Sequence, residues 1–179
     1  MVWISIIPDM LYFGSYPHEH ELVPWLRGRG SIKRLTLVDL TTQNERQSFS
    51  LGDPVDISFS ETTTLRIIRF PIEDHQIPPC IREFNSFLQM LKSEIMSKNI
   101  SEKHPMIIHC KGGHGRSPMV AAALMSILHQ EPVSDWINRI TQLHHATPGI
   151  HPKYLNRLCP VSSIQQEFLI NHFDSIYRP

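Results

Sequence analysis

One segment constrains the fold of this chain more than any other, because a short apolar run leads directly into a glycine-rich loop and then into a helix. Residues 105–109 are largely apolar and are typical of a short buried strand. Ser117 and Pro118 predict the N-cap and the first residue of a helix that continues through residues 119–129. Strand, loop and helix in this order form the basic unit of an α/β sheet, and ligands bind such sheets at the C-terminal ends of the strands.

The other predicted elements fit the same arrangement. Strands are predicted at residues 2–7, 11–13, 35–40 and 65–70, and helices at residues 81–95, 133–143 and 162–173. Residues 41–64 are rich in polar turn formers and predict an irregular segment with one strand near residues 55–59. We therefore expect an α/β fold with a central mixed, largely parallel sheet flanked by helices on both faces. With no internal repeat in 179 residues, residues 1–179 are expected to form a single domain.

The composition argues against several functional classes. Seventeen Lys and Arg balance seventeen Asp and Glu, so the surplus of positive charge that a nucleic-acid partner requires is missing. The longest unbroken apolar stretch, residues 119–125, is far shorter than the ~20 residues that span a bilayer, so no membrane insertion is expected. Three widely spaced cysteines without a CxxC pair fit a reducing compartment and a cytoplasmic location.

Eleven histidines raise the question of a metal site. His18 and His20, or His144 and His145, have no cysteine or carboxylate partner at a recognised ligand spacing. We therefore expect neither a metal nor another cofactor. The sequence makes no prediction about the oligomeric state.

Residues 110–116 begin with Cys110 and end with Arg116 in a C-x5-R spacing. The three glycines between them allow the backbone to curl so that successive N–H groups point into one anion-binding concavity. These dipoles, the following helix N-terminus and the guanidinium all favour the thiolate form of the cysteine. The guanidinium can also hold two oxygens of a phosphoryl group. The loop therefore predicts a phosphoryl group bound over the sulfur atom.

Two further side chains add positive charge at the variable positions of this loop. Lys111 is cationic at neutral pH, and His114, with an unperturbed pKa of ~6.5, is expected to become cationic as the pH falls toward 6. The predicted phosphate-binding residues are Lys111, Gly112, Gly113, His114, Gly115 and Arg116.

Residues 109–117, HCKGGHGRS, resemble the signature HCxxGxxR[ST] of the cysteine-dependent protein tyrosine phosphatase superfamily, in its compact dual-specificity branch. Residues 71–74, PIED, are similar to the general-acid loop of that family. The resemblance implies a single-domain dual-specificity phosphatase-like fold and a metal-independent double displacement through a phosphocysteine. In this reaction Cys110 is the nucleophile, Arg116 the phosphate clamp and Asp74 the general acid and base, while Ser117 donates a hydrogen bond to the sulfur.

Other polar positions near these motifs have competing interpretations. Glu73 is the sequence competitor of Asp74, and both could form a solvated acidic turn. His109 is implied to orient the loop rather than to act as an acid or base. Gln165 and Gln166 bear a slight similarity to the water-positioning glutamine of classical tyrosine phosphatases, but polar positions on an exposed helix face explain them better. We place both glutamines outside the site.

The function predicted first is hydrolysis of phosphotyrosine, with or without phosphoserine and phosphothreonine, so the expected partners are phosphorylated proteins. Residues 74–79 are similar to the acid loop of tensin-type phosphoinositide phosphatases, and phosphoinositides are therefore an alternative substrate. RNA 5′-triphosphatases of the same fold are another alternative. A non-catalytic phosphoprotein-binding module belongs to a different class, but such modules usually lack the cysteine, the arginine or the acid.

Overall fold

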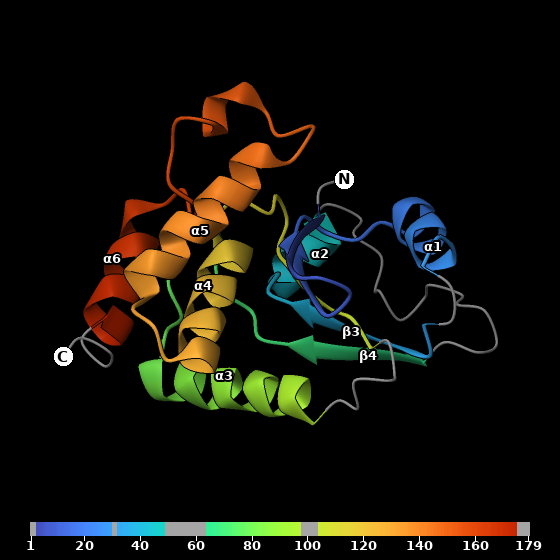
Figure 1. The fold of residues 1–179 in the computed structure, drawn as a ribbon, viewed down its shortest axis with the longest axis horizontal. Helices are drawn as coiled ribbons and strands as arrows, with labels where there is room; N and C mark the ends of the chain where they lie inside the picture. The colour runs from blue at the N-terminus through green and yellow to red at the C-terminus, as the bar shows by residue number, and fades with distance from the viewer. Residues whose placement is uncertain (1–2, 30–31, 49–63, 98–103, 175–179) are drawn as a thin grey trace.

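The structure of the protein is a computed structural model that describes residues 3–29, 32–48, 64–97 and 104–174 (Figure 1). Its centre is a five-stranded sheet in the order β1-β2-β5-β3-β4. The strands are β1 Trp3–Ile7, β2 Leu11–Gly14, β3 Arg34–Asp39, β4 Thr64–Arg69 and β5 Met106–His109. β1 pairs antiparallel with β2, and the other pairs are parallel. The predicted mixed, largely parallel sheet is confirmed, and the strand predicted near residues 55–59 lies outside the described residues.

β5 lies in the middle of the sheet, between β2 and β3, and leads into the glycine-rich loop. All four of its residues are buried. Ile107 packs into the hydrophobic cluster on one face of the sheet, and Ile108 packs into the cluster on the other. Because both faces are covered, the strand has no alternation of apolar and polar residues.

Helices cover both faces of the sheet, as predicted. On one face lie α3 Ile81–Met96, α4 Arg116–His129, α5 Val133–Ala146 and α6 Ser163–Phe173 (Figure 1). α4 packs against the other three helices and against β2 and β5, so almost all of its residues are buried. The residues that bury α4 also fix the position of its N-terminus relative to the loop. Within the described parts of the chain, no helix is both long and apolar enough to cross a membrane.

α1, Glu19–Arg27, covers the opposite face of the sheet and is not predicted from the sequence. It buries only Leu22 and Leu26, and Pro24 lies inside it. A short helix that contains a proline and buries so few apolar residues gives a weak periodic signal.

α2, Gln43–Ser48, lies in the segment predicted to be irregular. It carries no apolar residue, so hydrophobic periodicity does not reveal it. Its start is stabilised reciprocally: Glu45 N donates to Thr42 Oγ1 at 3.3 Å, and Thr42 N donates to Glu45 Oε2 at 3.0 Å. This is a capping box, and the Thr-x-x-Glu pattern is the signal that locates the helix in the sequence.

Candidate active site

The loop of residues 110–116, which we call the phosphate loop, follows β5 at the C-terminal edge of the sheet. The end of β2 supports its first half. Cys110 N donates to Gly14 O at 3.3 Å, and Tyr16 N donates to Lys111 O at 3.2 Å. The backbone that follows β2 therefore holds the loop in register with the central strand.

Gly113 is the position in this loop where only glycine fits. Its φ is +80°, and a Cβ atom there would lie 2.6 Å from Ser15 N and 2.7 Å from Gly14 C. Both the left-handed backbone and the backbone atoms next to it exclude a side chain. The predicted curl of the loop thus depends on the close approach of the chain that follows β2.

The sulfur of Cys110 lies inside the curl of the loop, on a residue that is 3% exposed. Gly113 N donates to Sγ at 3.3 Å, and Ser117 Oγ lies 3.5 Å from it. Ser117 Oγ also donates to Gly14 O at 3.0 Å. The Gly113 N–H group thus points at the sulfur, and the Ser117 hydroxyl lies beside it with its proton directed at Gly14 O.

The prediction that Ser117 caps α4 is wrong. The helix begins at Arg116 with Gly115 in the N-cap position, and Ser117 makes no capping hydrogen bond. Its hydroxyl lies toward the sulfur and β2 instead. Because the chain turns at Gly115, the helix starts earlier than predicted, and its positive N-terminal end comes nearer to the loop.

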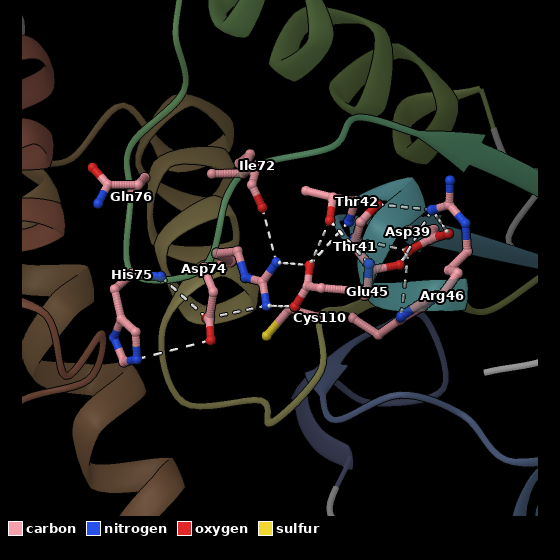
Figure 2. A network of polar contacts seen from close by, with 12 residues as sticks. Asp39, Thr41, Thr42, Glu45, Arg46, Ile72, Asp74, His75, Gln76 and Cys110 are labelled. Atoms are coloured by element: carbon pink, nitrogen blue, oxygen red, sulfur yellow. Dashed lines mark hydrogen bonds and ion pairs between the residues drawn. The ribbon is translucent and has the colours of Figure 1, made fainter. Parts of the chain in front are cut away.

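Arg116 is almost fully buried, with 1% of its surface exposed. Its Nη1 donates to Glu45 Oε2 at 2.6 Å and to Ile72 O at 2.8 Å, and its Nη2 donates to Glu45 Oε1 at 2.7 Å and lies 3.1 Å from Asp74 Oδ1 (Figure 2). The hydrogen bonds to Glu45 and Ile72 use three of the four N–H bonds of the terminal nitrogens, and the contact with Asp74 is an ion pair. Nε is buried and has no hydrogen-bond partner among the described residues. Desolvation lowers the pKa of Arg116, but the hydrogen bonds to Glu45 and the negative charges of Cys110, Glu45 and Asp74 together raise this pKa above its usual value.

Asp74 lies at the edge of the phosphate loop, whereas Glu73 lines a different cavity. The Asp74 carboxylate contacts Arg116 and accepts a hydrogen bond from His75 N at 3.1 Å, yet 54% of its side chain is exposed (Figure 2). It lines the same pocket as Cys110. Glu73 lines a neighbouring cavity of about 650 Å³ instead.

Glu45 is a site residue that the sequence analysis missed. It comes from α2, and Arg46 on the same helix anchors this helix by donating to Asp39 Oδ2 at 3.0 Å (Figure 2). Burial raises the pKa of Glu45, but hydrogen bonds from Arg116 and Thr42 bring this pKa below its usual value. Glu45 is therefore a carboxylate at neutral pH and holds the guanidinium in place.

The prediction that His114 becomes cationic as the pH falls toward 6 is wrong. Its Nδ1 lies 2.8 Å from Nε2 of His144, and its ring stacks on Tyr154 with 3.9 Å between the ring centroids. Desolvation, and then the charge of Lys153, lowers the pKa of His114 to about 4. Desolvation, followed by the neighbouring imidazoles, also lowers the pKa of His144 to about 4. His114 thus supports the loop as a neutral side chain.

His109 is fully buried at the end of β5. Neither of its ring nitrogens has a hydrogen-bond partner among the described residues, although Asp39 Oδ1 lies 3.9 Å from Nδ1. Burial lowers the pKa of His109 to about 4, against the opposing charge of Asp39. The imidazole is therefore neutral at neutral pH.

His109, His114 and His144 should make the protein less stable as the pH is lowered from 7 to 5. The unfolded imidazoles take up protons near pH 6.5, whereas the folded ones do so only near pH 4, so the unfolded state binds more protons in between. Each histidine can lower the free energy of unfolding by up to ~1.4 kcal/mol per pH unit. Urea unfolding at pH 7, 6 and 5 measures the effect.

The exposed His20 provides the control for this pH dependence. His20→Gln should retain the wild-type slope, and His144→Gln should flatten it. A wild-type free energy of unfolding that stays constant from pH 7 to pH 5 would contradict the prediction.

The phosphate loop opens into a pocket of about 440 Å³. One wall comes from the chain after α5, which includes the 3-10 helix η2, Pro152–Tyr154. Its lining side chains are Lys153, Tyr154, Arg157 and Val161. The sequence analysis missed this wall because irregular backbone between two helices has no periodic signal. No group of three or more His, Cys, Asp or Glu side chains suited to a metal ion occurs in the parts of the chain that the structure describes.

Gln165 is not on an exposed helix face, contrary to the prediction. It is fully buried, and its Nε2 donates to Gln76 O at 2.7 Å. Its Oε1 lies only 3.0 Å from where a Cβ atom of Gly115 would be. Gln165 therefore links α6 to the chain that follows β4 and lies against the phosphate loop. Gln166 is partly buried and donates to Pro160 O at 2.6 Å.

Comparison with known proteins identifies relatives of this chain. The model of the family described as "Swiss Army Knife protein, DSP-PTPase phosphatase domain", PTP-SAK, matches residues 2–167. Protein 197R of Invertebrate iridescent virus 6 is 33% identical over 94% of this chain, and protein 067L of Invertebrate iridescent virus 3 is 25% identical over 93%. The names of both describe them as tyrosine phosphatases. The chain spans only 58% and 63% of the lengths of these two viral proteins.

The fold is similar to that of a solved phosphatase. The crystal structure of kinase associated phosphatase, in which serine replaces the catalytic-site cysteine, matches with a TM-score of 0.65 over 97% of this chain and 93% of that chain. The two sequences are 17% identical, so this likeness concerns the fold. The family model, by contrast, matches residues 2–167, which include the phosphate loop and residues 71–74. The chain therefore belongs to the PTP-SAK family of dual-specificity and tyrosine phosphatase domains.

Proposed function

We propose that this chain hydrolyses phosphotyrosine, with or without phosphoserine and phosphothreonine, in proteins through a phosphocysteine intermediate. One observation carries the proposal: the sulfur of Cys110, the curled phosphate loop and Arg116 face one pocket that Asp74 also lines. Because the chain supplies both the nucleophile and the charge that stabilises the transferring phosphoryl group, the reaction needs no metal.

In the first step the Cys110 thiolate attacks phosphorus, a P–S bond forms and the P–O bond to the tyrosyl oxygen breaks. Protonated Asp74 gives its proton to the leaving oxygen, so a neutral phenol departs. The loop N–H groups and Arg116 stabilise the equatorial oxygens of the transition state. The products of this step are the dephosphorylated protein and a phosphocysteine.

In the second step water attacks the phosphocysteine. Asp74, now a carboxylate, takes a proton from the water as the new P–O bond forms, and the sulfur leaves as a thiolate. Ser117 Oγ, 3.5 Å from the sulfur, can turn its proton from Gly14 O toward the leaving sulfur. Inorganic phosphate then departs and the resting cysteine is restored.

The resting contact between Asp74 and Arg116 has a role in this cycle. Asp74 Oδ1 lies 3.1 Å from Nη2, and the adjacent Nε–H has no partner among the described residues. A phosphoryl group that binds Nε and Nη2 side by side takes the place of the carboxylate. Substrate binding thus releases the Asp74 carboxyl from the guanidinium, so that it can face the leaving oxygen in the first step.

Replacement of Asp74 by alanine should slow hydrolysis of phosphotyrosine peptides by ~10²–10⁴-fold in kcat, because the tyrosyl oxygen would leave without a proton. The loss should be much smaller for an aryl phosphate with a good leaving group. It should also remove the basic limb of the pH profile of kcat/KM. Steady-state kinetics on both substrates measures the difference.

Glu73→Gln is the matched control, since Glu73 lines the neighbouring cavity. This variant should retain the wild-type dependence on the leaving group. If Glu73→Gln reproduces the expected pattern and Asp74→Ala does not, Glu73 is the acid instead. Binding of phosphopeptide should persist in Asp74→Ala, because a competitor for Arg116 has been removed.

The proposal is tested most directly by a substrate panel. Wild type and Cys110→Ser are assayed against phosphotyrosine, phosphoserine and phosphothreonine peptides, phosphoinositides and RNA with a 5′-triphosphate. For the wild type we expect the highest kcat/KM on phosphotyrosine peptides. For Cys110→Ser we expect no turnover of any of these substrates. Faster turnover of a phosphoinositide or of RNA than of every phosphopeptide would overturn the substrate class. Binding of phosphopeptide without any turnover by wild type would indicate a binding module.

A further inference from the structure

We infer that the pocket contains a second anion subsite, formed by Lys153 and Arg157, that selects peptides with a second phosphoryl group near the phosphorylated residue under attack. This inference rests on the proposed function, because it concerns the same pocket and the same phosphopeptide substrates. In this inference the chain after α5, which forms one wall of the pocket, binds the part of the substrate beyond the phosphoryl group under attack.

The charges that line the pocket are strongly unbalanced. Lys111, Arg116, Lys153 and Arg157 are cationic, whereas Asp74 supplies the carboxylate. The guanidinium of Arg116 already bonds with Glu45 and lies beside Asp74. Across the described part of the chain, neither Lys153 nor Arg157 forms an ion pair with a carboxylate. Two cations therefore face the pocket in excess of those that hold the phosphoryl group under attack.

The wall that carries these cations is fixed to the phosphate loop. The ring of Tyr154 stacks on His114, and Val161 N donates to His114 O at 2.9 Å. The wall is tied to α5 as well, because Nε2 of His145 lies 3.0 Å from Arg157 O. These contacts hold the backbone on both sides of the two cationic side chains, so the subsite needs little reorganisation on binding.

The pocket is large enough for more than one phosphoryl group. Its volume of about 440 Å³ equals that of roughly 15 water molecules at ~30 Å³ each. Arg157 can hold two oxygens of a second phosphoryl group, and Lys153, whose Nζ lies 4.8 Å from the centroid of the Tyr154 ring, adds a point charge. His114 of the phosphate loop, whose ring stacks on Tyr154, is a neutral imidazole at neutral pH and adds no charge to this wall.

A phosphopeptide fits these observations better than a polynucleotide does. Lys and Arg do not exceed Asp and Glu over the whole chain, with seventeen of each, so a long polyanion finds little net attraction. The excess charge is local to one pocket wall. A second phosphorylated side chain brings a localised dianion to that wall, and the rest of the peptide adds no charge that must be balanced.

The test compares peptides that differ only in one phosphoryl group. Wild type should hydrolyse the phosphotyrosine of a doubly phosphorylated peptide with kcat/KM about tenfold higher than that of the singly phosphorylated peptide. The ratio should fall to about one in the double variant Lys153→Gln, Arg157→Gln. Arg82→Gln, which removes an exposed cation on α3, is the matched control and should keep the wild-type ratio. The preference should also decrease as salt is added.

A binding measurement separates recognition from chemistry. In the Cys110→Ser background, calorimetry should give a Kd about tenfold lower for the doubly phosphorylated peptide, and the Lys153→Gln, Arg157→Gln changes should remove this difference. Thermal unfolding checks that each variant is folded. Equal values for the two peptides in wild type would overturn the subsite while leaving the proposed function intact. Absence of turnover of either peptide would overturn the proposed function itself. If the Lys153→Gln, Arg157→Gln variant loses turnover only of RNA 5′-triphosphates or only of phosphoinositides, the wall recognises that ligand instead.

Discussion

Replacement of Cys110 by serine should reduce kcat on every phosphorylated substrate by at least ~10⁴-fold, to the limit of detection. A serine hydroxyl at this position has no base to remove its proton, because His109 is buried without a hydrogen-bond partner among the described residues and Ser117 Oγ already donates to Gly14 O. The phosphate loop and Arg116 stay in place, so phosphopeptide binding should persist. Rapid-quench kinetics and calorimetry measure the two properties separately. Retained turnover in Cys110→Ser would end the proposal.

Thiol chemistry provides an independent measurement of the same residue. Alkylation or peroxide should inactivate the wild type, vanadate should inhibit it, and a metal chelator should have no effect. Burial, with the charge of Cys110 adding to it, raises the pKa of Cys159, so this second buried thiol should react slowly. Cys159→Ser and Cys80→Ser should therefore be inactivated at the wild-type rate. Protection in either variant would mean that another cysteine is the reactive one.

Arg116→Lys should lower kcat/KM by ~10²–10³-fold. An ammonium cannot bond both Glu45 oxygens and Ile72 O while presenting two parallel N–H groups to a phosphoryl group, which the guanidinium can do when Asp74 moves away. The partly buried carboxylate of Glu45 still has a cation beside it in this variant. The loss of activity should therefore greatly exceed any loss of folded protein. Steady-state kinetics and thermal unfolding of the same preparation measure the two effects.

Two further variants sharpen this test. Arg82→Lys makes the same change on the exposed surface of α3 and should retain wild-type kcat/KM. Glu45→Gln should give an intermediate loss, because it removes the charge that orients Arg116 while keeping one oxygen acceptor. If Arg116→Lys stays close to wild type, the guanidinium does not clamp the phosphoryl group. If Glu45→Gln has no effect, its bidentate contact does not position Arg116.

Most of the sheet and the main helices could be predicted from the sequence because their apolar residues form short unbroken runs or repeat with the period of a helix. β5 and α3 are typical examples, with a fully buried strand and one apolar helix face. α1 and α2 could not be found in this way. α1 contains Pro24 and buries two leucines, and α2 depends on the polar contacts of Thr42 and Glu45 rather than on apolar burial.

The site residues show the same difference between features that a local sequence pattern reveals and features that it does not. Cys110, the glycines and Arg116 are neighbours in the sequence, so their chemistry could be predicted from residue types and spacing. Glu45 contacts Arg116 across 71 residues, and Gln165 contacts Gln76 across 89, and no local pattern encodes these distances. His114 illustrates the second difficulty. Its position was predicted, but its charge depends on burial beside His144 and Tyr154, which only the fold determines.

The support of the phosphate loop by the end of β2 has a consequence for how this protein folds. Ser117 Oγ and Gly14 O are 103 residues apart in the chain, and Cys110 N bonds to the same carbonyl. Contacts this distant form only after the intervening chain has lost much of its conformational freedom. A fragment that lacks the β1–β2 hairpin would have the cysteine, the glycines and the arginine but no backbone to hold the loop in its curl. Recovery of activity during refolding is therefore expected only after β2 has paired with β5 and its end holds the loop.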